Sequence, residues 1–313
     1  MNIRSFQPGD EVAQLTIYNT AAGGLPKFKP ATIVDLQRRV QAKEFDPTTR
    51  VFADVAGKPV GYCTFQANGR VGYPWCLPGF DSAAEPLFAR TLESMTQRGV
   101  RKAFCAYRSD WPSINDFFSK HGFKLAREMV NYVLSFDNIP TASIKQGITI
   151  TPATAEDMPG IFALDPTAFR VPTAEALTDS LLRNPWFDAS SVFVLRSRTD
   201  RSPQAAGVFI TNGQYADPRA VDSSMPCFRL GAFGTEGMTT KRLRGLFSFI
   251  ARPDRNIFTT GMDMLSIAAN RLTDADDINC YAAQVATDAP ALASFYQRVF
   301  ERQGSFPVYE RTL

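Results

Sequence analysis

The sequence repeats one stretch of itself at a fixed spacing. Residues 107–118 align without a gap over residues 285–296, at a constant offset of 178 positions. Within this window an aspartate, a proline and a phenylalanine coincide, and a serine faces a threonine. The two copies of a duplicated sequence are expected to adopt the same fold, so this repeat restricts the possible folds more than the composition does.

Turn signals and hydrophobic spacing predict one order of elements for both halves: strand, two helices, three antiparallel strands, helix, strand, helix and strand. In the first half these elements are predicted at residues 2–6, 10–20, 32–43, 50–55, 60–66, 71–76, 82–98, 101–107, 112–120 and 124–136. In the second half they are predicted at 148–151, 154–164, 175–184, 191–196, 206–211, 227–234, 246–269, 278–285, 291–301 and 306–311.

The polar, proline-containing residues 138–147 are interpreted as a linker, so the predicted domains are 1–137 and 148–313. The predicted fold class is α/β (α+β), with two tandem domains. Each domain holds a mixed, mostly antiparallel sheet flanked by helices.

Composition excludes several classes of function. Hydrophobic residues make up 44% and charged residues 21% of 313 residues, and the net charge is only +3, which argues against a nucleic-acid partner. No apolar run approaches the roughly 20 residues of a membrane span, and the first residues do not resemble a signal peptide. Five cysteines without Cys-x-x-Cys spacing and a single histidine, His121, favour a reducing cytoplasm and argue against a metal site.

The order of elements resembles that of the GNAT (N-acetyltransferase) superfamily, and the resemblance covers nearly the whole chain, twice. Residues 117–123, Phe-Phe-Ser-Lys-His-Gly-Phe, look like a signature of that superfamily. The resemblance implies an acetyl-CoA-dependent N-acetyltransferase that acts on a primary amine of a small molecule or peptide. Acetyl-CoA would be a substrate, and no metal is expected.

GNAT proteins hold the pyrophosphate of acetyl-CoA on an Arg/Gln-x-x-Gly-x-Gly/Ala loop between the fourth strand and the third helix. A helix N-terminus suits an anion because its first amides are unpaired and its dipole is positive. In the second half, Arg242-x-x-Gly245-x-Phe247 matches this pattern except for Phe247 at the last, normally small, position. The predicted donor-binding residues are Phe233, Gly234, Lys241, Arg242, Leu243, Arg244, Gly245, Leu246 and Phe247.

The same junction in the first half, residues 75–86, has no lysine or arginine. Ser82-x-x-Glu85 is predicted to form a capping box, as is Thr154-x-x-Asp157 in the second half. Asp81 and Glu85 would repel a pyrophosphate, so the first domain is predicted to be degenerate and non-catalytic.

Acetyl transfer to an amine requires a proton for the departing thiolate, and the resemblance assigns that role to a tyrosine on the fourth helix. The repeat places Tyr296 there in the second half and Phe118, which carries no proton to donate, in the first. Tyr296 is therefore the predicted general acid of a direct transfer. Glu236, just past the predicted fourth strand, is the candidate base, and the backbone at Phe233 and Gly234 could face the thioester oxygen.

Two alternatives stay open. The chain could be a non-catalytic acyl-CoA or peptide binding module with both halves degenerate, or a transferase for a longer acyl group. The loop at 212–226 could contact the acceptor, the other domain or a second subunit, so a homodimer also stays open.

Overall fold

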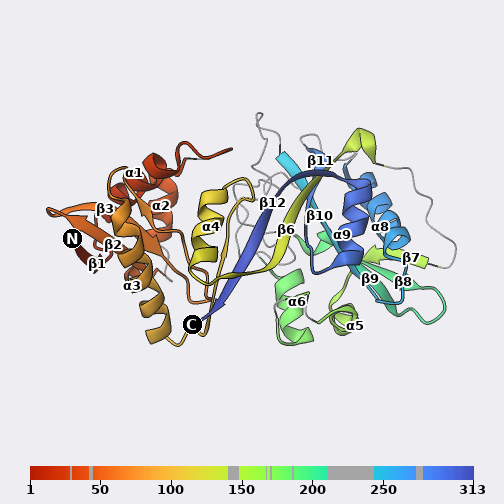
Figure 1. Cartoon of the computed structure of the whole chain (residues 1–313). Helices are drawn as coiled ribbons and strands as arrows, with labels where there is room; N and C mark the ends of the chain where they lie inside the picture. The colour runs from red at the N-terminus through yellow and green to blue at the C-terminus, as the bar shows by residue number, and fades with distance from the viewer. Residues whose placement is uncertain are drawn as a thin grey trace. The chain divides into compact units, whose positions relative to one another are not determined.

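The computed structural model describes residues 1–28, 30–41, 45–139, 148–166, 168–169, 171–184, 187–210, 243–272 and 278–313. The chain forms two compact units. Unit 1 consists of Met1–Glu128 and Phe306–Leu313, and unit 2 consists of Met129–Ser305. Figure 1 follows the elements of both units along the chain.

The elements of unit 1 follow the predicted order. Its helices are α1 (Asp10–Ala22), α2 (Ile33–Val40), α3 (Ala84–Gln97) and α4 (Pro112–Lys120). Its strands are β1 (Asn2–Ser5), β2 (Arg50–Val55), β3 (Lys58–Thr64), β4 (Trp75–Cys76), β5 (Lys102–Ala106) and the end of β12 (Glu301–Thr312). Strands β1 to β4 form an antiparallel sheet in that order, and β5 pairs antiparallel with β12.

Unit 2 has the same plan. Its helices are α5 (Met158–Leu164), α6 (Ala174–Leu182), α8 (Ile257–Leu272) and α9 (Pro290–Val299). Its strands are β7 (Ile148–Pro152), β8 (Val192–Ser197), β9 (Pro203–Ile210), β10 (Leu243–Ala251), β11 (Ile278–Ala286) and the end of β6 (Lys124–Ser135). The strand order is β6-β11-β10-β9-β8-β7, and β10 and β11 run parallel.

The compact units differ from the domain boundaries drawn from the sequence, because each half gives its last strand to the other unit. Residues Met129–Ser135 of β6 pair with β11 in unit 2, and Val308–Thr312 of β12 pair with β5 in unit 1. A strand joins the core of the sheet that supplies its hydrogen bonds, whatever its place along the chain.

One predicted helix is wrong at its beginning. Residues 246–269 were expected to be largely helical, but β10 continues to Ala251 and α8 begins only at Ile257. Phe247 and Phe249 alternate into the core with 0% and 3% exposure, which is strand periodicity. Pro253 also disfavours helix at the residue before it. The strand expected at 227–234 and the loop at 212–226 lie outside the described residues.

The two predicted capping boxes have different outcomes. Thr154 and Asp157 form theirs, with both reciprocal bonds present. Ser82 and Glu85 do not, because a 3₁₀ turn at Asp81–Ala83 precedes α3 and no side chain caps either element. Glu85 instead accepts a hydrogen bond from His121 Nε2 at 2.7 Å.

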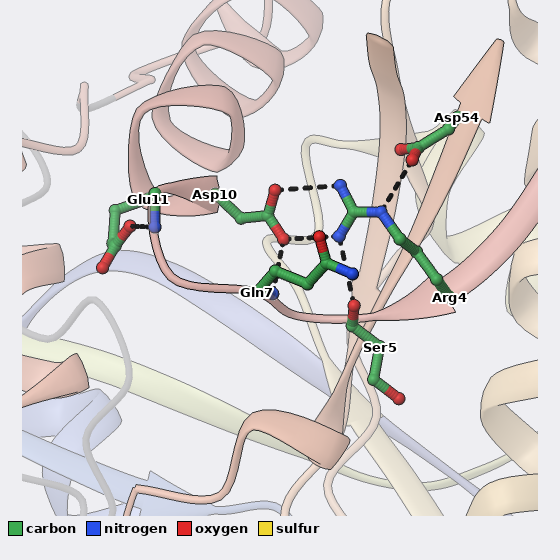
Figure 2. Close-up of polar contacts among 7 residues, drawn as sticks. Arg4, Ser5, Gln7, Asp10, Glu11 and Asp54 are labelled. Atoms are coloured by element: carbon green, nitrogen blue, oxygen red, sulfur yellow. Dashed lines mark hydrogen bonds and ion pairs between the residues drawn. The ribbon is translucent and has the colours of Figure 1, made fainter. Parts of the chain in front are cut away.

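A nearly buried arginine joins three elements of unit 1. Arg4 on β1 donates through both terminal nitrogens to Asp10, which begins α1, at 2.6 and 2.9 Å. Its Nε donates to Asp54 on β2 at 2.6 Å, so Figure 2 shows the guanidinium between two carboxylates. Asp10 also accepts the backbone amide of Gln7 at 2.6 Å, which fixes the turn before the helix. The three charged side chains are 9–17% exposed.

Replacing Arg4 by Met should lower the free energy of unfolding by about 3 kcal/mol, since two nearly buried carboxylates lose their cation. Arg183→Met is the matched control, because Arg183 and Asp179 form an exposed i,i+4 pair with 73% and 70% exposure. That control should change stability by less than about 0.5 kcal/mol. Urea unfolding measures both, and equal losses would contradict a structural role for Arg4.

Helices α8 and α9, which lie side by side in Figure 1, contact each other through a glycine. A Cβ added at Gly261 would lie 2.4 Å from the ring of Phe295, which is 1% exposed. Gly261→Ala should therefore destabilise the chain by about 1–3 kcal/mol despite the better helix propensity of alanine. Gly24→Ala is the control, because a Cβ there meets nothing within 4 Å. Thermal unfolding should separate the two variants by several degrees.

Candidate active site

Strands β10 and β11 run parallel and then part. Their pairing is recorded at Leu243 with Ile278, Gly245 with Tyr281 and Leu246 with Ala282. Past this point β10 pairs with β9 as far as Ala251, and β11 pairs with β6 as far as Ala286. Where two strands part, backbone groups on their facing edges need other partners, and an extended ligand can supply them.

Helix α9 places Tyr296 at this parting. Its hydroxyl is hydrogen-bonded to the backbone of Phe249, three residues past the last parallel pair on β10. The side chain is 2% exposed and stacks on Tyr132 of β6, with ring centroids 5.9 Å apart. Burial raises the pKa of Tyr296 well above that of a phenol in water, and the bond to Phe249 opposes this rise. The phenol therefore keeps its proton at neutral pH.

Unit 1 contains the same parting with a different tyrosine. The parallel bridge there joins Arg70 to Phe104, and the amide three residues further on belongs to Tyr73. This amide donates to the hydroxyl of Tyr107 at 2.5 Å. Burial raises the pKa of Tyr107, and the bond from the Tyr73 backbone opposes the rise. Phe118 takes the helix position of Tyr296 and is fully buried.

The first turn of α3 in unit 1 is acidic, as predicted. Glu85 lies there and bonds to His121 at the end of α4, and Asp81 lies in the 3₁₀ turn just before α3. The other ring nitrogen of His121 bonds to the carbonyl of Phe117 at 2.7 Å. The beginning of α3 is thus joined to α4 by side chains of the chain itself.

The corresponding junction of unit 2 lies between β10 and α8. Arg252 forms a bidentate ion pair with Asp254 at 3.0 and 2.8 Å. Asn256 accepts the amide of Thr259 at 3.1 Å, so its side chain caps the helix. The hydroxyl of Thr260, in the first turn of α8, is fully buried and has no hydrogen-bond partner in the described structure.

The predicted donor-binding residues fall into two groups. Phe233, Gly234, Glu236, Lys241 and Arg242 lie outside the described residues. Leu243, Arg244, Gly245, Leu246 and Phe247 lie within β10, so placing them at a helix N-terminus was wrong. The backbones of Gly245 and Phe247 pair with Tyr281 and Phe209, because the strand continues through both.

Sequence reasoning missed three features of the site: the Phe249 backbone, the Thr260 hydroxyl and Tyr107. The repeat already aligned Tyr107 with Val285, which is a tyrosine against an aliphatic residue at the parting. That difference was a usable signal. A backbone amide has no sequence signal of its own.

Among the residues that the structure describes, no three or more His, Cys, Asp or Glu side chains gather where they could hold a metal ion. No helix in the same residues is long and apolar enough to cross a membrane.

Comparison with solved structures finds the same architecture in acetyltransferases. A GCN5-related N-acetyltransferase from Sphaerobacter thermophilus superposes with a TM-score of 0.62 at 14% identity, over 99% of this chain and 95% of that one. A tandem GNAT protein from the clavulanic acid biosynthesis pathway gives 0.56 at 11% identity, over 99% and 98%.

A glucosamine N-acetyltransferase region of a fungal multi-domain β-N-acetylglucosaminidase gives a TM-score of 0.69 at 12% identity, over 99% of this chain. The chain spans 38% of that larger protein. No protein-family model and no curated protein matches the sequence. The chain therefore has the fold of these two-domain GNAT acetyltransferases.

Proposed function

We propose that the chain is an acetyl-CoA-dependent N-acetyltransferase whose active site lies in unit 2, and that it acts on a primary amine of a small molecule or peptide. The observation that carries the proposal is the bond between the Tyr296 hydroxyl and the Phe249 backbone where β10 and β11 part. One proton donor and one backbone amide thus meet at one point of the sheet.

In the proposed reaction, the thioester lies between β10 and β11 with its carbonyl oxygen against the Phe249 amide. The amine attacks the carbonyl carbon, and the amide stabilises the negative charge that develops on oxygen. The C–S bond then breaks, the thiolate takes the proton of Tyr296, and the amine gives up its own proton to a base. The products are the N-acetylated amine and CoA.

The resting bond between Tyr296 and Phe249 fits this sequence of events. A thioester carbonyl can accept the hydrogen bond of the Phe249 amide only when the Tyr296 hydroxyl no longer accepts it. The released hydroxyl then lies next to the carbonyl carbon and its sulfur, where the proton is required. Binding of acetyl-CoA would in this way position the Tyr296 hydroxyl to act as the general acid.

For the pyrophosphate we propose the beginning of α8 in place of the segment within β10. The amides of a helix N-terminus favour an anion, and the buried Thr260 hydroxyl in the first turn lacks a partner in the described structure. Arg255 supplies positive charge just before this turn, where Arg252 is already paired with Asp254. Glu236 as base, and Phe233, Gly234, Lys241 and Arg242 as donor contacts, stay predictions.

Unit 1 is proposed to have a structural role. The Tyr73 amide, where its parallel strands part, already donates to the Tyr107 hydroxyl. Asp81 and Glu85 make the start of α3 a poor anion site. A second candidate function, a non-catalytic acyl-CoA binding module, draws on the deep burial of Tyr296 in unit 2. Thiol release from acetyl-CoA by the wild-type chain in the presence of primary amines distinguishes the two functions.

Calorimetry with CoA should give one equivalent per chain, and Arg252→Glu combined with Arg255→Glu should weaken binding about 10- to 100-fold, the loss expected for charge-assisted bonds. Arg90→Glu with Arg183→Glu is the control, because it makes the same charge change at exposed helix positions. Unchanged affinity in the first double variant rejects the α8 site. A loss of affinity confined to Arg242→Glu with Arg244→Glu would support the site predicted from the sequence. Binding of two equivalents of CoA per chain would contradict the proposal that unit 1 binds no CoA.

Tyr296→Phe should lower turnover by up to the 10²- to 10⁴-fold typical of general acids, while CoA affinity stays the same. Tyr281→Phe is the matched control, since this buried tyrosine of β11 donates to Ala268 of α8 at 2.8 Å. It should lose stability and keep turnover. Single-turnover measurement of thiol release avoids masking by product release. Wild-type chemistry in Tyr296→Phe would make the tyrosine a packing residue, whereas absence of thiol release by the wild-type chain with every amine would favour the binding module.

A further inference from the structure

A polar pair lies across β11 and β6 just beyond the parting of the sheet in unit 2. Gln284 pairs directly with Asn131, and its Nε2 donates to Asn131 Oδ1 at 2.7 Å. Asn131 is 2% exposed. The other amide atom, Gln284 Oε1, is buried and has no hydrogen-bond partner in the described structure. A buried carbonyl oxygen without a donor is unfavourable, so its presence calls for an explanation.

The duplicated unit provides the comparison. At the same offset of 178 positions, Gln284 corresponds to Ala106 on β5. Its cross-strand partner there is Val308, which pairs directly with Ala106. Unit 1 thus fills the same two positions with apolar side chains. The fold does not need an amide pair at this place, and the pair occurs in the unit that has a tyrosine at the position of Tyr296.

The position of Gln284 relates it to the proposed chemistry. It lies two residues past the last parallel pair on β11, while Phe249 lies three past it on β10. Tyr281 of β11 bonds to α8, and Tyr132 of β6 stacks on Tyr296 of α9. Side chains alternate along a strand, so Gln284 and Asn131 occupy the opposite face of the sheet from these helices. The proton donor and the unpaired carbonyl oxygen flank the parting from two sides.

We propose that Gln284, positioned by Asn131, binds the acceptor amine. Its Oε1 accepts a hydrogen bond from the N–H of a primary amine and holds the nitrogen on the face of the sheet opposite Tyr296. This inference rests on the proposed transferase function and adds the acceptor contact to it. An amine that enters from this face attacks the thioester carbonyl from one side of the sheet. Tyr296, which protonates the departing thiolate, lies on the other side. Asn131 is a positioning residue, because it fixes which amide atom of Gln284 is left for the ligand.

The test uses the full chain, a panel of primary amines and acetyl-CoA, with thiol release as the readout. Gln284→Ala and the similarly sized Gln284→Met should lower kcat/KM for the acceptor about 10- to 100-fold, as expected when a bond to an amine or ammonium is lost. The affinity for CoA, measured by calorimetry, should stay unchanged. Gln204→Ala is the control, because this buried glutamine at the start of β9 bonds only locally, to Ser202 at 2.6 Å, and should keep acceptor kinetics.

The outcomes separate the two proposals. Wild-type acceptor kinetics in both Gln284 variants overturn this inference and leave the transferase function intact. A loss of CoA affinity equal to the loss of kcat/KM also overturns it, since that is the pattern of a general structural defect. Absence of thiol release by the wild type with every amine, while CoA binds, rejects the transferase function and this inference with it. Gln284→Met guards against misfolding, because it retains the length of the side chain.

Discussion

The parting of two parallel strands is the constraint on which both units depend. A parallel pair such as β10 and β11 satisfies the backbone groups on its facing edges only while it stays together; β9 and β6 pair with the outer edges, so beyond Leu246 the facing edges need other partners. The amide three residues further on is then available to a hydroxyl. Unit 2 supplies that hydroxyl from a helix, with Tyr296, and unit 1 supplies it from the residue after β5, with Tyr107.

The exchange of last strands makes the two halves of the sequence mutually dependent. Strand β6, from the first half, covers β11 from Cys280 to Ala286 and brings Asn131 and Tyr132 next to the candidate site. A fragment that begins at Ile148 would therefore leave the edge of β11 unpaired beside the proposed chemistry. The role of the first half includes completing the sheet of unit 2, whether or not unit 1 binds any ligand.

The sequence predicts the fold well because both halves obey the same local rules. Helix α4 begins and ends as predicted, and prolines 112 and 290 each occupy the first turn of a helix. The prediction failed where a motif competed with periodicity: Arg242-x-x-Gly245-x-Phe247 resembled a phosphate loop, while Phe247 and Phe249 showed the spacing of a strand. The pair of Gln284 and Asn131 joins positions 153 residues apart. Only the strand register, which depends on the exchange of β6, brings them together.

The two units differ in where they place polar groups near the parting strands. Unit 2 has Tyr296 and the pair of Gln284 with Asn131 where unit 1 has Phe118 and the pair of Ala106 with Val308, whereas unit 1 has Tyr107 where unit 2 has Val285. Around the parting of unit 1, Tyr107 and Phe118 stack with centroids 5.6 Å apart. Polar groups in a buried sheet lower stability unless they are satisfied, and Gln284 Oε1 of unit 2 has no hydrogen-bond partner in the described structure. Unit 1 has an alanine at the corresponding position, so the fold itself does not require this oxygen, which supports the acceptor contact proposed for it.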